Sequence, residues 1–174
     1  MRGWNHLTIL KAMERVPGCR FRICGFGAED TYLQELQAMP AWERTELLGK
    51  IPHEEIPRFL ADGSIGVALA SYMRGNYWKT GTIGNTKIFE EMMAGLPVVC
   101  TDFTLWREFV ERWHCGICVE PEDPDSIAAA IQYLLDHPAE AREMGENGRK
   151  AIEAEFNWSM EEKKLLALYK EITE

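Results

Sequence analysis

The residues best suited to chemistry lie between positions 85 and 102, in the run Asn-Thr-Lys-Ile-Phe-Glu-Glu-Met-Met-Ala-Gly-Leu-Pro-Val-Val-Cys-Thr-Asp. Glu90 falls within the first turns of an expected helix, where the helix dipole favours a carboxylate. A carboxylate on that flank could accept hydrogen bonds from two neighbouring hydroxyls of a ligand. Most helix glutamates are simply solvated, and the local pattern alone favours that alternative.

The same run contains the signals that would position Glu90. Asn85 can cap a helix, Gly95 supplies a left-handed exit, and Pro97 prevents the helix from continuing. The spacing predicts a helix over 86–94 that leads into a buried strand. Its inward face is expected to consist of Ile88, Phe89, Met92 and Met93.

The rest of the chain alternates short apolar runs with longer amphipathic stretches, which indicates strands separated by helices. Parallel pairing with crossover helices follows, so the sequence predicts an α/β fold: a doubly wound, Rossmann-like parallel sheet flanked by helices on both faces. Ligands of such folds bind beyond the carboxyl ends of the strands. Strands are expected at 21–24, 46–48, 64–70, 96–100 and 116–119, and helices at 31–37, 54–61, 86–94, 105–113, 126–135, 139–155 and 159–172.

Length and composition bound the class of protein. The 174 residues and 46% hydrophobic content suit one domain with a well-buried core. A formal charge of −9 opposes broad attraction to nucleic acid or an anionic membrane, so a phosphate ligand would need a few placed cations or helix-start amides. Neither a membrane span nor a signal-peptide apolar region is visible, so we expect a cytoplasmic protein without direct membrane insertion.

One connection, over residues 71–84, is unusually long. It carries three glycines, the cations Arg74 and Lys79, and the aromatic residues Tyr72, Tyr77 and Trp78. Loops of this length in a compact domain are usually functional, and this one follows the carboxyl end of a strand. We expect a flap over a ligand, with a surface excursion as the alternative.

Two glycine- or acid-containing motifs do not fit the chemistry they suggest. Gly25 and Gly27 could open a dinucleotide fingerprint, but Asp30 occupies the third glycine position, which argues against NAD or FAD. Asp123 precedes Pro124 at an expected helix start, so it is interpreted as a cap rather than as part of a metal-binding pair.

The cysteines and histidines give no metal or redox signature. Cys115 and Cys118 have zinc spacing but lack a second pair and lead into a strand, so structural thiols are the favoured interpretation. Five cysteines in a chain of this size do not predict a disulfide framework. The four histidines are scattered, and no metal site is expected.

Several segments resemble, in order, the group 1 family of retaining glycosyltransferases with GT-B architecture. Lys-Ile-Phe-Glu-Glu-Met-Met-Ala-Gly-Leu-Pro-Val-Val at 87–99 is similar to the family's Lys-[Leu/Ile]-Phe-Glu-Tyr-Met-Ala-Ala-Gly-x-Pro-Val-Val signature. The similarity extends over nearly the whole chain. Further matching segments are Phe-Arg-Ile-Cys-Gly-Phe-Gly at 21–27, Leu-Leu-Gly-Lys-Ile at 47–51, Ala-Asp-Gly-Ser-Ile-Gly-Val at 61–67, Cys-Gly-Ile-Cys-Val at 115–119 and Met-Gly-Glu-Asn-Gly-Arg at 144–149.

The resemblance implies roles around the helix at 86–94. Glu90 matches the glutamate that holds the nucleotide ribose. Thr86, Lys87 and Ile88 match the helix start whose main chain faces the diphosphate, for which amides at a helix N-terminus have a physical basis.

The resemblance implies further contacts elsewhere in the chain. Gly25 and Gly27 match a turn that brings the main chain close to the ligand. Lys50 and Ile51 match the rim where main-chain groups meet the base. Arg2 matches the cation of a Lys/Arg-Gly pair that neutralises the diphosphate.

This sequence departs from the family pattern in the loop at 71–84. The family often has a first glutamate eight positions before the ribose-binding one, and Thr82 occupies that position here. Thr82, Arg74 and Lys79 are therefore candidates for contacts with the donor sugar, and sugar choice stays open. No catalytic residue is assigned.

The resemblance also implies the function and the domain organisation. Residues 1–174 would form a single nucleotide-sugar-binding domain, the C-terminal half of a GT-B enzyme without its first strand and without the N-terminal acceptor-binding domain. That enzyme would transfer a glycosyl group from a UDP- or GDP-sugar to an acceptor hydroxyl with retention, without a metal or cofactor, and could associate with a membrane through its acceptor half.

Two other classes of protein stay open. One is a non-catalytic Rossmann-like module, and the other is a domain of another GT-B-like enzyme, such as a nucleotide-sugar epimerase or a phosphorylase. Thr82 and the missing arginine partner, which would end the family's first strand, favour the non-catalytic module. The signature around Glu90 is closer to the transferases. On the transferase interpretation, we expect this chain alone to bind donor and to transfer sugar poorly or not at all.

Overall fold

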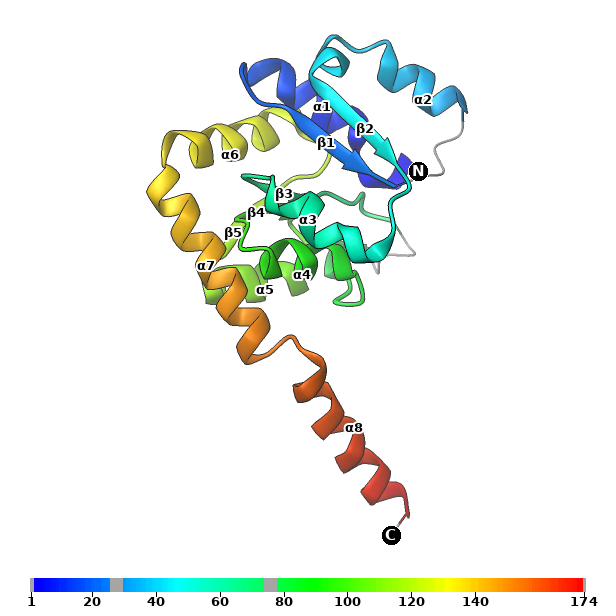
Figure 1. The fold of residues 1–174 in the computed structure, drawn as a ribbon, viewed down its shortest axis with the longest axis vertical. Coiled ribbons are helices and arrows are strands. Elements are labelled where there is room, and N and C mark those ends of the chain that lie inside the picture. Colours follow the sequence, from blue (N-terminus) through cyan, green and yellow to red (C-terminus); the bar gives the residue numbers. More distant parts are fainter. Residues whose placement is uncertain (1, 26–29, 74–77, 174) are drawn as a thin grey trace.

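The computed structural model describes residues 2–25, 30–73 and 78–173, and Gly27 and Arg74 lie outside this part. Figure 1 shows the strands at the centre, with helices around them. In chain order the elements are η1 (Arg2–Trp4), α1 (His6–Arg15), β1 (Phe21–Cys24), α2 (Asp30–Gln37), η2 (Pro40–Arg44), β2 (Thr45–Gly49), η3 (His53–Glu55), α3 (Ile56–Ala61), β3 (Gly66–Ala68), η5 (Trp78–Thr80), α4 (Thr86–Met93), β4 (Val98–Thr101), α5 (Thr104–Trp113), β5 (Gly116–Val119), α6 (Pro124–Asp136), α7 (Pro138–Ala154) and α8 (Trp158–Thr173).

All strand pairs in the described residues are parallel, and they form two sheets. β1 pairs with β2, and β3, β4 and β5 form the second sheet in that order. The predicted α/β class with parallel strands and flanking helices is confirmed. The strands do not join into one sheet, because no described strand lies between β1 and β3.

Two buried clusters cover the opposite faces of the strands. β4 shows the alternation that separates them, since Val99 joins one cluster while Val98 and Cys100 join the other. The first cluster includes Ile9, Leu10 and Met13 of α1 with Ile127, Ile131 and Leu134 of α6. The second includes Ile88 and Met92 of α4 with Trp106 and Phe109 of α5 and Ala151 and Ile152 of α7.

Helix α1 was not expected from the sequence. It starts after Asn5, which adopts a left-handed conformation and makes no side-chain cap, and its first turn carries no acidic residue. The usual start signals are thus missing, although Ile9, Leu10 and Met13 have helical spacing and are buried.

Helix α4 begins and ends where the sequence predicted. The Asn85 carboxamide oxygen accepts from the Lys87 amide at 3.3 Å, and Gly95 has a φ of 78°. Ile88 and Met92 are fully buried, as expected. The prediction for Met93 was wrong, because the side chain is 50% exposed on the side of α4 away from that face.

Helix α7 crosses the end of α4 at Gly145, close to the main chain of Gly95. A Cβ at Gly145 would lie 2.0 Å from the Gly95 carbonyl oxygen, whereas one at Gly148 would meet Met92 at an ordinary 3.4 Å. Helix α8, by contrast, contains no buried residue and extends away from the body in Figure 1. The helix that supports α4 from behind is therefore α7.

We expect Gly145→Ala to destabilise the fold by about 1–3 kcal/mol, because the new methyl group would force the α7–α4 contact apart. Gly148→Ala is the matched control, since it adds a methyl group without a clash and removes a helix glycine, which stabilises by roughly 0.5–1 kcal/mol. Urea unfolding of both variants measures the effect. Equal stability of the two would contradict this account of the helix crossing.

Candidate functional site

A cavity of about 680 Å³ opens at the carboxyl ends of β1 and β2. Five residues predicted for ligand binding line it, although they come from distant parts of the sequence. They are Gly25 after β1, Lys50 and Ile51 after β2, and Lys87 and Glu90 on α4. The fold therefore gathers the main predicted site residues around one space.

The turn after β1 has the conformation that its predicted role needs. Gly25 adopts a φ of 139°, a region that side-chain-bearing residues rarely enter, and a Cβ there would meet no atom within 4 Å. Its amide donates to the Gly49 carbonyl at 2.8 Å, which ties the ends of β1 and β2 together. This leaves an open main-chain surface at the cavity rim.

Glu90 is half-buried rather than solvated, and it contacts a histidine. Its Oε1 lies 3.3 Å from Nε2 of His53, and the Glu90 side chain is 33% exposed while that of His53 is 86% exposed. No role was predicted for His53. Its place in η3, just after the carboxyl end of β2, is the signal that could have singled it out.

Lys87 rests on an aromatic ring. Its Nζ lies 4.3 Å from the centroid of the Trp4 ring, within the range of a cation–π contact. Trp4 was not predicted for the site, but η1 carries it to the cavity wall. Arg2 also belongs to η1, and its side chain lies outside the described part of the structure.

The residues of the first turn of α4 that were predicted to contact phosphate differ in the exposure of their side chains. Thr86 is exposed, whereas Ile88 is fully buried in the core. Only the main chain of Ile88 is therefore in a position to serve a ligand. This agrees with a role for helix-start amides and with a purely structural role for the Ile88 side chain.

Glu91 lies on the wall of the same cavity, and its carboxylate is buried. Burial raises its pKa to about 8, although a hydrogen bond from the Val67 amide partly offsets the effect. In the described structure its Oε2 has no hydrogen-bond partner. Gly66 permits this approach, because a Cβ there would lie 2.8 Å from the Glu91 Cβ.

The described part of the long loop packs beside α5 instead of lining the cavity. The Thr82 carbonyl accepts from Trp106 Nε1 at 2.8 Å, and the Lys79 carbonyl lies 3.4 Å from the Thr104 hydroxyl. Neither Thr82 nor Lys79 lines the cavity. The predicted donor-sugar contacts therefore form a group separate from Glu90, while Arg74 lies outside the described residues.

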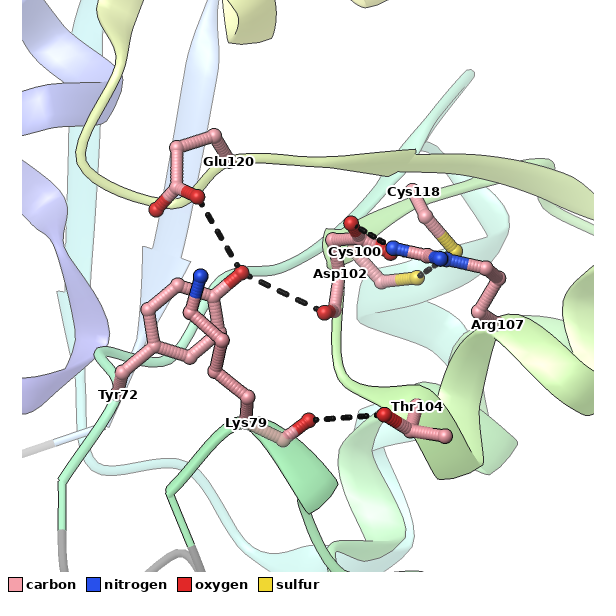
Figure 2. A network of polar contacts seen from close by, with 8 residues as sticks. All are labelled: Tyr72, Lys79, Cys100, Asp102, Thr104, Arg107, Cys118 and Glu120. Carbon is pink, nitrogen blue, oxygen red and sulfur yellow. Dashed lines mark hydrogen bonds and ion pairs between the residues drawn. The ribbon is translucent and has the colours of Figure 1, made fainter.

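Figure 2 shows the polar network around this loop, at the carboxyl ends of β3, β4 and β5. The Tyr72 hydroxyl lies 3.4 Å from both the Asp102 carbonyl and a Glu120 carboxylate oxygen, and Lys79 Nζ lies 5.1 Å from the Tyr72 ring centroid. Burial, followed by the charge of Glu120, raises the Tyr72 pKa to about 12. Tyr72 is thus a neutral donor that holds these strand ends together.

The five cysteines are free thiols, and Asp123 caps a helix. Among the described residues, all five thiols are free, Cys115 is fully buried, and no three His, Cys, Asp or Glu side chains gather as a metal site would require. Cys100 and Cys118 face each other across β4 and β5 with their Sγ atoms 3.7 Å apart. The Asp123 side chain accepts from the Asp125 amide at 2.9 Å, which confirms the predicted cap.

In the part of the chain that the structure describes, every helix is too short or too polar to cross a membrane.

The comparison with protein families identifies the class. Residues 4–151 match the family described as glycosyl transferases group 1. Since the match covers most of the chain, the protein belongs to this family. The predicted relationship to group 1 glycosyltransferases is confirmed.

A relative illustrates how much of such an enzyme this chain represents. The chain is 27% identical, over 157 residues, to the GDP-mannose-dependent monoacylated alpha-(1-6)-phosphatidylinositol monomannoside mannosyltransferase of Corynebacterium glutamicum. The alignment covers 88% of this chain and 40% of the relative. The chain therefore corresponds to less than half of that enzyme.

Solved structures share the fold. Sucrose-phosphate synthase from Thermosynechococcus elongatus matches 99% of this chain and 43% of its own, with a TM-score of 0.85 and 24% identity. HepE from Anabaena in complex with UDP-glucose matches 98% of this chain and 46% of its own, with a TM-score of 0.81 and 17% identity. The fold is that of one half of a GT-B glycosyltransferase.

The buried Glu91 makes stability depend on pH. Its pKa is about 8 in the folded chain and 4.5 in the reference state, so the folded chain holds a proton between these values that the unfolded chain loses. The free energy of unfolding should therefore fall as pH rises from 4.5 to 8. Glu91→Gln should be more stable than the wild type at pH 9 by a few kcal/mol, since a tenfold change in proton affinity corresponds to about 1.4 kcal/mol.

Denaturant unfolding of wild type and Glu91→Gln from pH 5 to 9 measures this difference. His6, whose pKa burial lowers to about 4, titrates identically in both proteins and cancels. The control is Glu54→Gln, which changes an exposed carboxylate that is not among the groups that shift the Glu91 pKa. Parallel pH profiles for wild type and Glu91→Gln would show that Glu91 is ionised in the folded chain.

Proposed function

We propose that this chain binds a nucleoside diphosphate sugar in the cavity beyond β1 and β2, as the donor-binding half of a retaining glycosyltransferase. The observation that carries the proposal is the convergence of Gly25, Lys50, Ile51, Lys87 and Glu90 on one cavity. These residues supply open main chain, a cation and a carboxylate, the groups that a base, a diphosphate and a ribose require. Transfer to an acceptor hydroxyl would need the rest of a longer enzyme.

The arrangement suggests how the ligand would lie. Glu90 would accept hydrogen bonds from the two ribose hydroxyls, in competition with its contact to His53. The base would lie against the main chain of Gly25 and Lys50. The diphosphate would then approach the first turn of α4, where amides and the Lys87 ammonium offset its charge without a metal ion.

The relatives support a UDP- or GDP-linked donor. The C. glutamicum enzyme is named as GDP-mannose-dependent, and the Anabaena structure contains UDP-glucose. The base, the sugar and the acceptor are not distinguished by the residues around the cavity. A donor set that includes both bases is therefore the appropriate probe.

Calorimetric titration with UDP, GDP, ADP, UDP-glucose and GDP-mannose tests binding directly. We expect Glu90→Ala to weaken binding of the preferred ligand by about 10- to 150-fold, which corresponds to about 1.5–3 kcal/mol for a hydrogen bond to a charged group. Glu54→Ala is the matched control, because Glu54 is an exposed carboxylate on η3 outside the cavity lining. Absence of nucleotide binding, or equal affinity of the Glu90→Ala variant, would overturn the proposal.

A second titration examines the diphosphate position. Lys87→Ala should weaken binding of the nucleoside diphosphate by up to about fivefold, the usual scale for an exposed charge pair, and should leave the parent nucleoside unaffected. Lys79→Ala is the control, since Lys79 packs on Tyr72 away from the cavity. An equal loss for nucleoside and diphosphate would indicate that Lys87 contributes to packing with Trp4 instead.

A further inference from the structure

Two thiols meet on adjacent strands of the second sheet. Cys100 of β4 and Cys118 of β5 are paired residues of the parallel ladder, so their side chains project from the same face. Their Sγ atoms are 3.7 Å apart, and Figure 2 shows them directed toward each other. Neither residue lines the cavity beyond β1 and β2, so the pair lies outside the proposed nucleotide site.

The spacing of the two strands suits a covalent bond between these thiols. Neighbouring strands lie about 4.8 Å apart. Disulfides span Cα separations of about 4.4–6.8 Å. The sulfur atoms would approach from 3.7 Å to about 2.05 Å as the bond formed. The ladder thus holds both residues within the range of backbone separations that a disulfide requires.

The two thiols differ in exposure, which sets their order of reaction. Cys118 is partly exposed on β5, the last strand of its sheet in the described structure, whereas Cys100 is fully buried on the central strand. The hydrogen bond with Cys118, followed by burial, raises the pKa of Cys100 well above its ordinary value. Cys118 is therefore the thiol that a reagent in solution would meet first, and Cys100 would react second.

A cation lies near the exposed member of the pair. Arg107 of α5 forms an ion pair with Asp102, and Figure 2 shows this ion pair together with the two sulfur atoms. The hydrogen bond with Asp102 raises the pKa of Arg107, and negative charge on Cys118 adds to this effect. The same attraction would stabilise a thiolate at Cys118, which is the form that attacks a disulfide.

Cys115 is the competing thiol nearest along the chain, and the fold directs it elsewhere. Its Sγ donates to the Val110 carbonyl at 3.9 Å. Burial, followed by the charge of Cys118, raises the Cys115 pKa to about 12. In an unfolded chain, by contrast, Cys115 would be the favoured partner of Cys118, because a short loop closes at the lowest entropic cost. The identity of the partner therefore reports whether the fold directs the reaction.

We propose that Cys100 and Cys118 are a site of reversible disulfide formation by exchange with a small-molecule disulfide such as oxidised glutathione. The Cys118 thiolate attacks one sulfur of the reagent, which releases one thiolate and leaves a mixed disulfide. Cys100 then attacks the Cys118 sulfur and releases the second thiolate. The two thiol protons of the chain end on the two released thiols. The bond would tie β4 to β5 beside Thr101, whose hydroxyl holds the main chain of Ala70.

The test treats the folded chain with oxidised glutathione and maps the products after trypsin cleavage without reductant. We expect fragments 88–107 and 113–142 to be joined, the intact chain to lose the mass of two hydrogens, and dithiothreitol to reverse both changes. The melting temperature should rise by about 5 °C or more, because the bond closes a loop over 100–118. Fragmentation of the joined pair in the mass spectrometer distinguishes Cys118 from Cys115.

Cys118→Ser should abolish both the joined fragments and the rise in melting temperature. The matched control is Cys19→Ser, which removes another partly exposed thiol and should keep both effects. Circular dichroism under reducing conditions checks that the variants are folded, and if Cys118→Ser does not fold, the map of the wild-type chain decides.

Four results would overturn the proposal. They are the absence of joined fragments, a mixed disulfide that persists on Cys118, a bond from Cys118 to Cys115 in the folded chain, and a bond between two chains. Equal yield of the bond from Cys100 to Cys118 in concentrated urea would also contradict it, because the fold would then not direct the pairing.

Discussion

The rotation of α4 about its axis is the constraint on which the rest of the site depends. Ile88 and Met92 must face the core, where α5 and α7 surround them. At 100° per residue, this leaves Lys87, Glu90 and Glu91 together on the neighbouring flank, since they are spaced as i, i+3 and i+4. A slip of one residue would bury a charge, so the hydrophobic contacts behind α4 fix the polar surface in front of it.

The two adjacent glutamates on this flank have opposite environments. Glu90 reaches the cavity mouth and His53, while Glu91 is buried against β3 with its pKa raised to about 8. Near neutral pH Glu91 is therefore largely protonated. In a chain of net charge −9, protonation of Glu91 removes one negative charge from the flank of α4 that an approaching diphosphate would meet.

Much of the fold could be predicted from the sequence because its signals are local. Asn85 and Gly95 mark the ends of α4, and Asp123 with Pro124 marks the start of α6. Helix α1 lacks such signals, since Asn5 makes no side-chain cap. Residue periodicity did not show the separation between β1 and β3 either, because strand pairing is a long-range property that it does not encode.

The candidate site was predictable only as far as the family pattern extends. That pattern led to Glu90, Lys87 and Gly25, which do line the cavity. His53, Trp4 and Glu91 were missed, because their roles depend on which loop reaches the cavity and on how deeply α4 is buried. Thr82 was included in the predicted site only because it lies eight positions before Glu90. In the structure its carbonyl accepts a hydrogen bond from Trp106 of α5.

The cavity combines a polar mouth with an apolar interior, and η1 links the two. Trp4 lies on the cavity wall, and its ring makes a cation–π contact with the Lys87 ammonium. Any occupant that orders the interior would therefore also fix the aromatic partner of the cation at the mouth. An anionic ligand that fixed the Lys87 ammonium at the mouth would therefore also restrict the Trp4 side chain, and this ordering is part of the free-energy cost of binding.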